Sequence, residues 1–178
     1  GTAISEPRLN TQQLNLFGEG EYSSTPDSAS LDLTTTATWE MWGNFYGVVA
    51  SDGELFTKGS FSNLNNVSFR FVKNDSSAID EVTVSFGNGI NFATYDISGL
   101  SDSVAQIALT YSAGTLTGYV NGVEVTVTAQ SVNVVGSSII VSADPVLIGA
   151  WQDRDTFSDR KIGSTKIYNV ALTAAEVL

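Results

Sequence analysis

The sequence predicts an all-β fold, a sandwich of two antiparallel sheets, and three observations support this prediction. Apolar residues recur at every second position in several short runs, as in Ala37, Trp39 and Met41, which is the period of a strand with one buried face. Gly, Asn, Asp and Ser lie between the runs and supply turns. The pair Asn121-Gly122 favours the type I′ turn that joins antiparallel strands. Runs this short need two facing sheets to bury their inner faces, and their spacing predicts roughly ten to fourteen strands.

The expected strands follow one another along the chain. Runs with period two indicate strands at 37–42, 67–71, 82–86 and 107–111. Shorter apolar runs predict further strands at 139–141, 146–148 and 162–168.

The stretch LTYSAGTLTGYVNGVEV, from Leu109 to Val125, reverses twice, at Ala113-Gly114 and at Asn121-Gly122. It therefore predicts three consecutive antiparallel strands, with Val123, Val125 and Val127 on one face of the third. The two reversals are expected at opposite ends of the sandwich, where they make it rigid and leave recognition to longer loops at 48–66 and 151–161.

One helical signal stands at the end of the sequence. In ALTAAEVL, Thr173 can cap the first amides of a helix while Glu176, three residues later, completes a capping box. A single short C-terminal helix is expected. No linker, low-complexity tract or repeat divides residues 1–178, so one domain is expected.

Composition argues against several kinds of function. The net charge is −11 and the 8 basic residues are scattered, so no nucleic-acid partner is expected. Cys and His are both absent, which removes disulfides, thiolate chemistry, the usual zinc ligands and a serine–histidine triad. No apolar run is long enough to enter and cross a membrane, and no signal peptide is expected in this chain.

Three segments together carry a family resemblance. The segment from Leu14 to Trp42 has an apolar strand, an acidic Gly-rich turn and the stretch PDSASLDLT before an aromatic strand. The segment from Ile148 to Val177 ends in IYNVALTAAEV, and the YVNG turn lies between the two. In this order they resemble laminin-G-like domains of the concanavalin A-like lectin and glucanase superfamily. The resemblance implies a jelly roll of the concanavalin A-like kind.

The resemblance leaves several functions open, because this superfamily includes sugar-binding modules, adhesion domains, pentraxin-like assemblies and glycoside hydrolases. The hydrolase branch carries E-x-D-x-x-E on one strand, and no such triplet is present here. The nearest acidic pair, Asp80-Glu81, would point to opposite faces of a strand. The domain is therefore not expected to be an enzyme, and glycoside hydrolysis is the third hypothesis.

Aromatic side chains are the first candidates for ligand binding, because a flat ring stacks on the apolar face of a sugar. Trp39 and Trp42 lie at odd separation on one strand, so one is core and the other faces outward. Trp151 begins a polar loop and is the leading candidate; the alternative is a lid on the core. The expected ligand-binding residues are Trp151, Gln152, Asp153, Arg154 and Asp155.

Calcium is the one cofactor considered, since hard cations bind clustered oxygens. The acids that could meet around an ion are Glu19, Glu21, Asp153, Asp155 and Asp159. In relatives that bind a metal, the last strand is preceded by a motif that resembles G-x-I-D-[DE]-[VF]. This chain has Gly163 and Ser164 where that motif has its acidic residues. We therefore favour a solvated acidic loop over a calcium site.

The leading hypothesis is a non-catalytic recognition module that binds carbohydrate or another surface ligand, as in adhesion. The alternative is a structural or decoration protein of a virion (phage capsid or tail) or of an extracellular assembly, with other subunits or copies of itself as partners. The expected location is extracellular, at a cell surface or in a virion. A patch of aromatics and amides would indicate sugar binding, and an exposed apolar face would indicate assembly.

Overall fold

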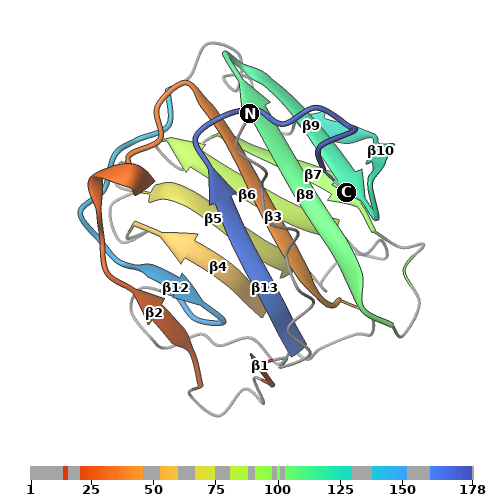
Figure 1. Cartoon of the computed structure of the whole chain (residues 1–178), viewed down its shortest axis with the longest axis horizontal. Coiled ribbons are helices and arrows are strands. Elements are labelled where there is room, and N and C mark those ends of the chain that lie inside the picture. Colours follow the sequence, from red (N-terminus) through yellow and green to blue (C-terminus); the bar gives the residue numbers. More distant parts are fainter. Residues whose placement is uncertain are drawn as a thin grey trace, which may run out of the picture.

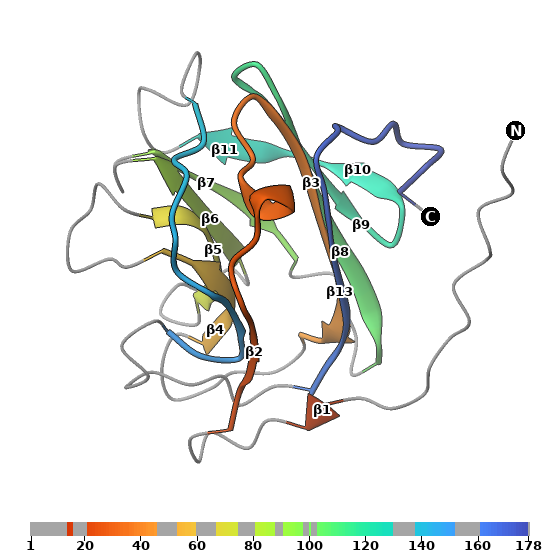
Figure 2. The same ribbon diagram turned by 60° about the vertical axis from the view of Figure 1, so that its left-hand side comes forward.

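The computed structural model describes residues 14–15, 21–45, 53–59, 67–74, 81–87, 91–97, 100, 103–129, 138–151 and 161–177. Within these residues, thirteen strands form two antiparallel sheets that face each other (Figures 1 and 2). Figure 1 shows β13, β3 and β8 crossing in front of β4, β5 and β6. The predicted all-β fold with two sheets is confirmed.

The first sheet has six strands in the order β1-β13-β3-β8-β9-β10. Their bounds are β1 Leu14–Asn15, β13 Lys161–Tyr168, β3 Thr36–Asn44, β8 Ala105–Ser112, β9 Thr115–Val120 and β10 Val123–Val125.

The second sheet has seven strands in the order β11-β7-β6-β5-β4-β12-β2. Their bounds are β11 Val127–Ala129, β7 Asn91–Asp96, β6 Glu81–Gly87, β5 Val67–Asn74, β4 Gly53–Lys58, β12 Val146–Ile148 and β2 Ser23–Thr25. A short 3-10 helix, η1 (Ala29–Leu31), leads from β2 towards β3.

Aromatic rings fill the space between the sheets. Trp39 of β3 lies 5.6 Å from Phe69 and 5.9 Å from Phe71 of β5, measured between ring centroids. Phe56 of β4 stacks on Phe71 at 4.6 Å. Trp42 is half-buried and is not part of this core, so the two tryptophans of β3 face opposite ways as predicted.

The predicted meander forms, with one change. Ala113 and Asn121 have positive φ angles of 46° and 50°, each followed by a positive-φ glycine, and the two turns lie at opposite ends of β9. The third strand, however, is divided between the sheets. Val125 pairs with Gly118 of β9, whereas Val127 pairs with Tyr95 of β7 in the other sheet. The valine run therefore crosses from one sheet to the other.

Two predicted elements are wrong. Residues 139–141 form no strand: the amide of the buried Ile139 donates to the carbonyl of Thr34, outside any ladder. The C-terminal helix is one turn, because the amides of Glu176 and Val177 both donate to Thr173. The residues before the turn are tied to β3, since Thr38 Oγ1 donates to the carbonyl of Val170.

The capping box itself is confirmed, since the amide of Thr173 donates to Glu176 Oε2 at 2.9 Å. The expected long loop at 48–66 is wrong in part, because Gly53–Lys58 forms the buried strand β4; β7 is a further strand that the sequence did not predict. In the part of the chain that the structure describes, no helix is long and apolar enough to span a membrane.

Candidate functional site

Trp151 lies where the chain leaves the end of β12 on the outer side of the seven-stranded sheet. Gly149 makes the bend possible, because its φ of 82° is a conformation that glycine adopts without strain. Its amide donates to the carbonyl of Leu55 in β4, which fixes the bend against the sheet. The indole of Trp151 is half-buried and does not belong to the core between the sheets.

Arg70 of β5 stacks on the indole of Trp151. Phe69 and Phe71 point into the core, so Arg70 between them points outward. The guanidinium carbon of Arg70 lies 4.2 Å from the centroid of the Trp151 ring, which is the geometry of a cation–π contact.

Glu54 of β4 holds this arginine in place. Arg70 Nε donates to both carboxylate oxygens of Glu54, at 3.0 and 3.1 Å, and Nη2 donates to Oε1. The side chain of Glu54 is only 1% exposed, so the ion pair is shielded from water. The carboxylate fixes the guanidinium, and the guanidinium in turn restrains the indole.

This arrangement gives a rigid aromatic surface. Thr57 of β4 adds a hydrogen bond from its Oγ1 to the carbonyl of Ala150, at 3.4 Å, beside Trp151. A ring that is already held loses little conformational entropy when a ligand stacks on it. The cluster of Trp151, Arg70, Glu54 and Thr57, here called the Trp151 site, can therefore hold the apolar face of a sugar ring.

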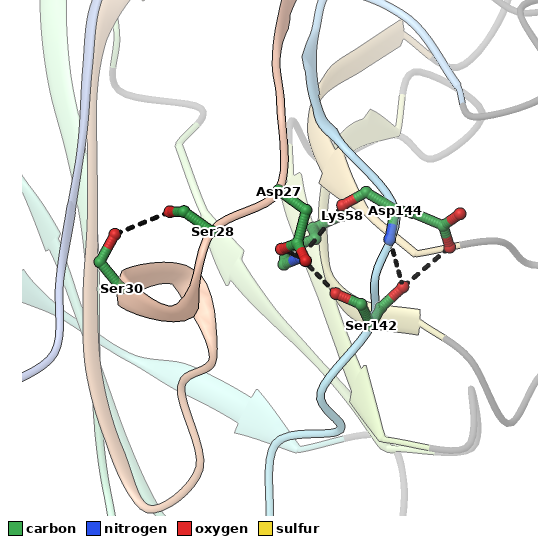
Figure 3. A network of polar contacts seen from close by, with 6 residues as sticks. All are labelled: Asp27, Ser28, Ser30, Lys58, Ser142 and Asp144. Carbon is green, nitrogen blue, oxygen red and sulfur yellow. Dashed lines mark hydrogen bonds and ion pairs between the residues drawn. The ribbon is translucent and has the colours of Figure 1, made fainter.

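A second polar cluster, the Lys58 corner, joins β4 to two distant segments (Figure 3). Lys58 Nζ is fully buried and donates to Asp27 Oδ1 at 2.5 Å and to the carbonyl of Asp144 at 3.0 Å. Lys58 Nζ also donates to the carbonyl of Ser142. The hydroxyl of Ser142 in turn donates to Asp144 Oδ2 at 2.8 Å. The hydrogen bond from Lys58 holds the pKa of Asp27 below its usual value.

A family model described as the concanavalin A-like lectin/glucanases superfamily matches residues 17–178. The chain belongs to this superfamily. The resemblance to laminin-G-like domains drawn from the sequence is confirmed. A comparison with curated protein sequences gave no match.

Solved structures with the same fold include binding modules and larger proteins. The CBM40 module of the Ruminococcus gnavus IT-sialidase, bound to α2,3-sialyllactose, is 13% identical with a TM-score of 0.62, and the match covers 94% of this chain and 96% of that one. Mouse laminin α1 domains LG4-5 are 11% identical with a TM-score of 0.62, covering 98% and 48%. A leech intramolecular trans-sialidase is 19% identical with a TM-score of 0.64, covering 93% and 27%. At these identities the likeness shows the fold alone.

The structure places only part of the predicted sites of this superfamily member. Of the predicted ligand-binding residues, Trp151 is described, and Gln152, Asp153, Arg154 and Asp155 lie outside the described residues. Sequence reasoning did not include Arg70 or Glu54. The position of Arg70 between two phenylalanines was the available signal, since alternation places it on the outer face.

The calcium prediction stays untested. Glu21 is exposed, and Glu19, Asp153, Asp155 and Asp159 lie outside the described residues. Among the residues that the structure describes, no group of three acidic, His or Cys side chains could hold a metal ion. Gly163 has a structural reason to lack a side chain, because a Cβ there would lie 3.0 Å from the carbonyl oxygen of Trp42.

Proposed function

We propose that this domain is a non-catalytic recognition module that binds carbohydrate at the Trp151 site. The observation that carries the proposal is the stack of Trp151 on Arg70, with Arg70 fixed by the buried Glu54. A half-buried indole held by an ion pair is a platform for the apolar face of a sugar, flanked by polar groups that can bind hydroxyls.

The fold supports this proposal, because the CBM40 module that it resembles was solved with α2,3-sialyllactose bound. Domains of the laminin-G and carbohydrate-binding kinds are typically extracellular. We therefore place the domain outside the cell or at its surface, with a glycan as its partner and adhesion as its role.

Three observations support recognition over catalysis. The E-x-D-x-x-E triplet of the superfamily's hydrolase branch is missing from the sequence. At the Trp151 site, both carboxylate oxygens of Glu54 accept hydrogen bonds from Arg70, so this carboxylate is already engaged by the protein itself. The match to the trans-sialidase covers 27% of that enzyme, so most of that protein has no counterpart here.

Assembly into a virion or another particle is the alternative, and the described surface gives it little support. The exposed large apolar side chains lie on five separate segments of the described chain: Tyr22, Val104, Val123, Val141 and Val170. No two of them share a strand, so they form no apolar face along any one described strand.

The test is a glycan array that includes α2,3-sialyllactose, followed by titration calorimetry with the glycan that binds best. Trp151→Ala is expected to weaken binding by about tenfold, which corresponds to a loss of about 1.4 kcal/mol, because it removes the ring on which the sugar stacks. Trp151→Phe should keep part of the affinity. Val123→Ala, which trims an exposed apolar side chain on β10 of the other sheet, is the control and should bind normally. Equal binding by Trp151→Ala and the wild type would refute the site.

A further inference from the structure

The outer face of the six-stranded sheet carries a polar cluster that the proposed function does not use. The register places its members side by side: Lys166 of β13 pairs with Glu40 of β3, and Trp42 of β3 pairs with Gln106 of β8. All of them lie on the face opposite the core, since Trp39 and Met41 of β3 point inward. We name the set the Glu40 cluster, with Tyr168 as its fifth member.

Glu40 is the centre of this cluster, and three donors converge on its carboxylate. Lys166 Nζ donates at 2.8 Å, Trp42 Nε1 at 3.0 Å and Tyr168 Oη at 3.4 Å. The side chain of Glu40 is 4% exposed, and a carboxylate this deeply buried needs such partners.

The protonation states agree with this arrangement. Burial lowers the pKa of Lys166, but the hydrogen bond and the charge of Glu40 outweigh burial and raise it, so Lys166 stays charged. Burial and the charge of Glu40 raise the pKa of Tyr168, so its phenol keeps the proton that it donates. The bond to Glu40 also fixes the half-buried indole of Trp42 on the face.

Gln106 is the member without a partner for its side chain. It is 1% exposed, and its Nε2 is buried with no hydrogen-bond acceptor in the structure. Its backbone is fully engaged, because its amide donates to Asn121 Oδ1 and its carbonyl accepts from the Asn121 amide. A buried donor left without an acceptor is destabilising, so a ligand that brought an acceptor to Gln106 Nε2 would relieve that cost.

The neighbouring part of the same face is already covered by the protein itself. Leu172 and Val177, in the segment after β13, pack against Ala108 and Tyr119. Figure 1 shows this segment turning back over β9. The same segment is bonded to Thr38, which donates to Val170 and accepts from Leu172. Trp42 and Gln106 lie further along β3 and β8 than Thr38 and Ala108, which this segment contacts.

We infer that the Glu40 cluster is a second ligand site, on the opposite face from the Trp151 site, and that it takes a neutral saccharide. Trp42 offers an aromatic ring held in place, and Gln106 Nε2 offers a donor for a hydroxyl oxygen. Lys166 and Glu40 neutralise each other, so the cluster has no charge with which to select an anion. The net charge of −11 on the protein also disfavours an anionic ligand.

The experiment follows the signals of Trp42 and Gln106 by nitrogen–proton NMR. The probes are the methyl glycosides of glucose, galactose, mannose and N-acetylglucosamine, each at about 10 mM so that a Kd near 1 mM is visible. At least one probe is expected to shift the indole signal of Trp42 and the side-chain amide signals of Gln106. Shifts at neither residue with any of the four probes would overturn the inference.

Two variants make the result specific. Gln106→Leu keeps a similar volume and removes the unpaired donor, so it should fold at least as stably while binding the active probe about tenfold more weakly. Unchanged affinity in Gln106→Leu would overturn the inference. Trp151→Ala should leave the Trp42 and Gln106 shifts intact, because this site does not depend on the Trp151 site. Loss of those shifts in Trp151→Ala would show that the glycosides bind at the Trp151 site alone. That result would overturn the second site and leave the proposed function intact.

Discussion

Lys58 Nζ lies 2.5 Å from Asp27 Oδ1, although the side chain of Lys58 is completely buried. The ammonium also contacts the carbonyls of Ser142 and Asp144, so three oxygens replace the water that it loses. These oxygens come from the segment after β2 and from the segment before β12. The Lys58 corner therefore fastens the last strands of the seven-stranded sheet to β4.

The first prediction concerns acid stability. Lys58 lowers the pKa of Asp27 below 3.8, its value in the unfolded chain, so the folded state favours the charged carboxylate. The ion pair of Asp27 with Lys58 therefore adds to the free energy of unfolding at pH values above 3.8. This stabilisation is lost as the pH falls through the lower pKa that Asp27 has in the folded state. Urea unfolding of the wild type and Asp27→Asn, measured from neutral pH down to about pH 2, should show their stabilities converging in acid.

Lys58→Met tests the same corner from the other side. It should cost on the order of 2 kcal/mol at neutral pH, because two carbonyls lose their donor and Asp27 loses its cation. Lys161→Met, which removes an exposed lysine, is the matched control and should change stability by less than about 0.5 kcal/mol. A Lys58→Met protein as stable as the control would show that the corner contributes no stability.

The second prediction concerns calcium. An ion that binds only the folded state raises the melting temperature, so chelation would lower it. We expect neither EDTA nor about 1 mM Ca²⁺ to change the melting temperature, because Gly163 and Ser164 supply no carboxylate and Lys58 occupies the corner beside Asp27. A rise of several degrees with calcium would contradict this expectation and favour a site among Glu19, Glu21, Asp153, Asp155 and Asp159.

Local patterns predicted the strands and turns whose own residues carry the periodicity or the turn signal. The alternation around Trp39 gave β3, and Asn121-Gly122 gave the turn between β9 and β10, because each pattern reflects the backbone of its own segment. The capping box at Thr173 was also read correctly, but the helix was not. Contacts with Thr38, far away in sequence, tie the preceding residues to β3 instead.

β4 could not be predicted in this way. Its six residues are all buried, yet they include Glu54, Thr57 and Lys58, which interrupt any apolar pattern. Burial of Glu54 depends on Arg70, and burial of Lys58 depends on Asp27 and on the segment near Ser142. The Trp151 site could not be predicted for the same reason. Arg70 contacts Trp151 only because β5 and β12 lie on either side of β4 in the folded sheet. A strand whose charges are neutralised by distant partners has no signature of its own.

The third prediction concerns the close approach of β3 and β13. A Cβ on Gly43 would lie 2.8 Å from the carbonyl oxygen of Lys161 and 2.9 Å from Cζ of Phe45. Gly43→Ala should therefore destabilise the fold by about 1–3 kcal/mol, measured by urea unfolding. Ser164→Ala, at an exposed position of β13, is the control and should be close to neutral. If Gly43→Ala matched the control, the backbones would have to separate more easily than the structure indicates.

The fourth prediction uses the two reversals of the meander. Asn121 has a φ of 50°, and its Oδ1 accepts from the amide of Gln106 at 2.9 Å, so its side chain also fastens β8. Asn121→Ala should lose about 1–2 kcal/mol of stability through strain at positive φ and through the lost acceptor. Gly122→Val should lose about 1 kcal/mol or more, because Gly122 has a φ of 74°. Glycan affinity at the Trp151 site, per folded molecule, should be unchanged in both.

The first reversal predicts a change of opposite sign. Ala113 has a φ of 46°, which an alanine adopts at a cost, whereas an asparagine tolerates it. Ala113→Asn makes this turn Asn-Gly like the second, and it keeps the backbone bond from residue 113 to the carbonyl of Thr35. We expect a gain of several tenths to about 1 kcal/mol, which is about 2–4 °C in melting temperature at most. Ala113→Ser, at the same exposed position without the tolerance for positive φ, should gain nothing. If Ala113→Asn and Ala113→Ser melt together, strain at this turn does not limit the stability of the sandwich.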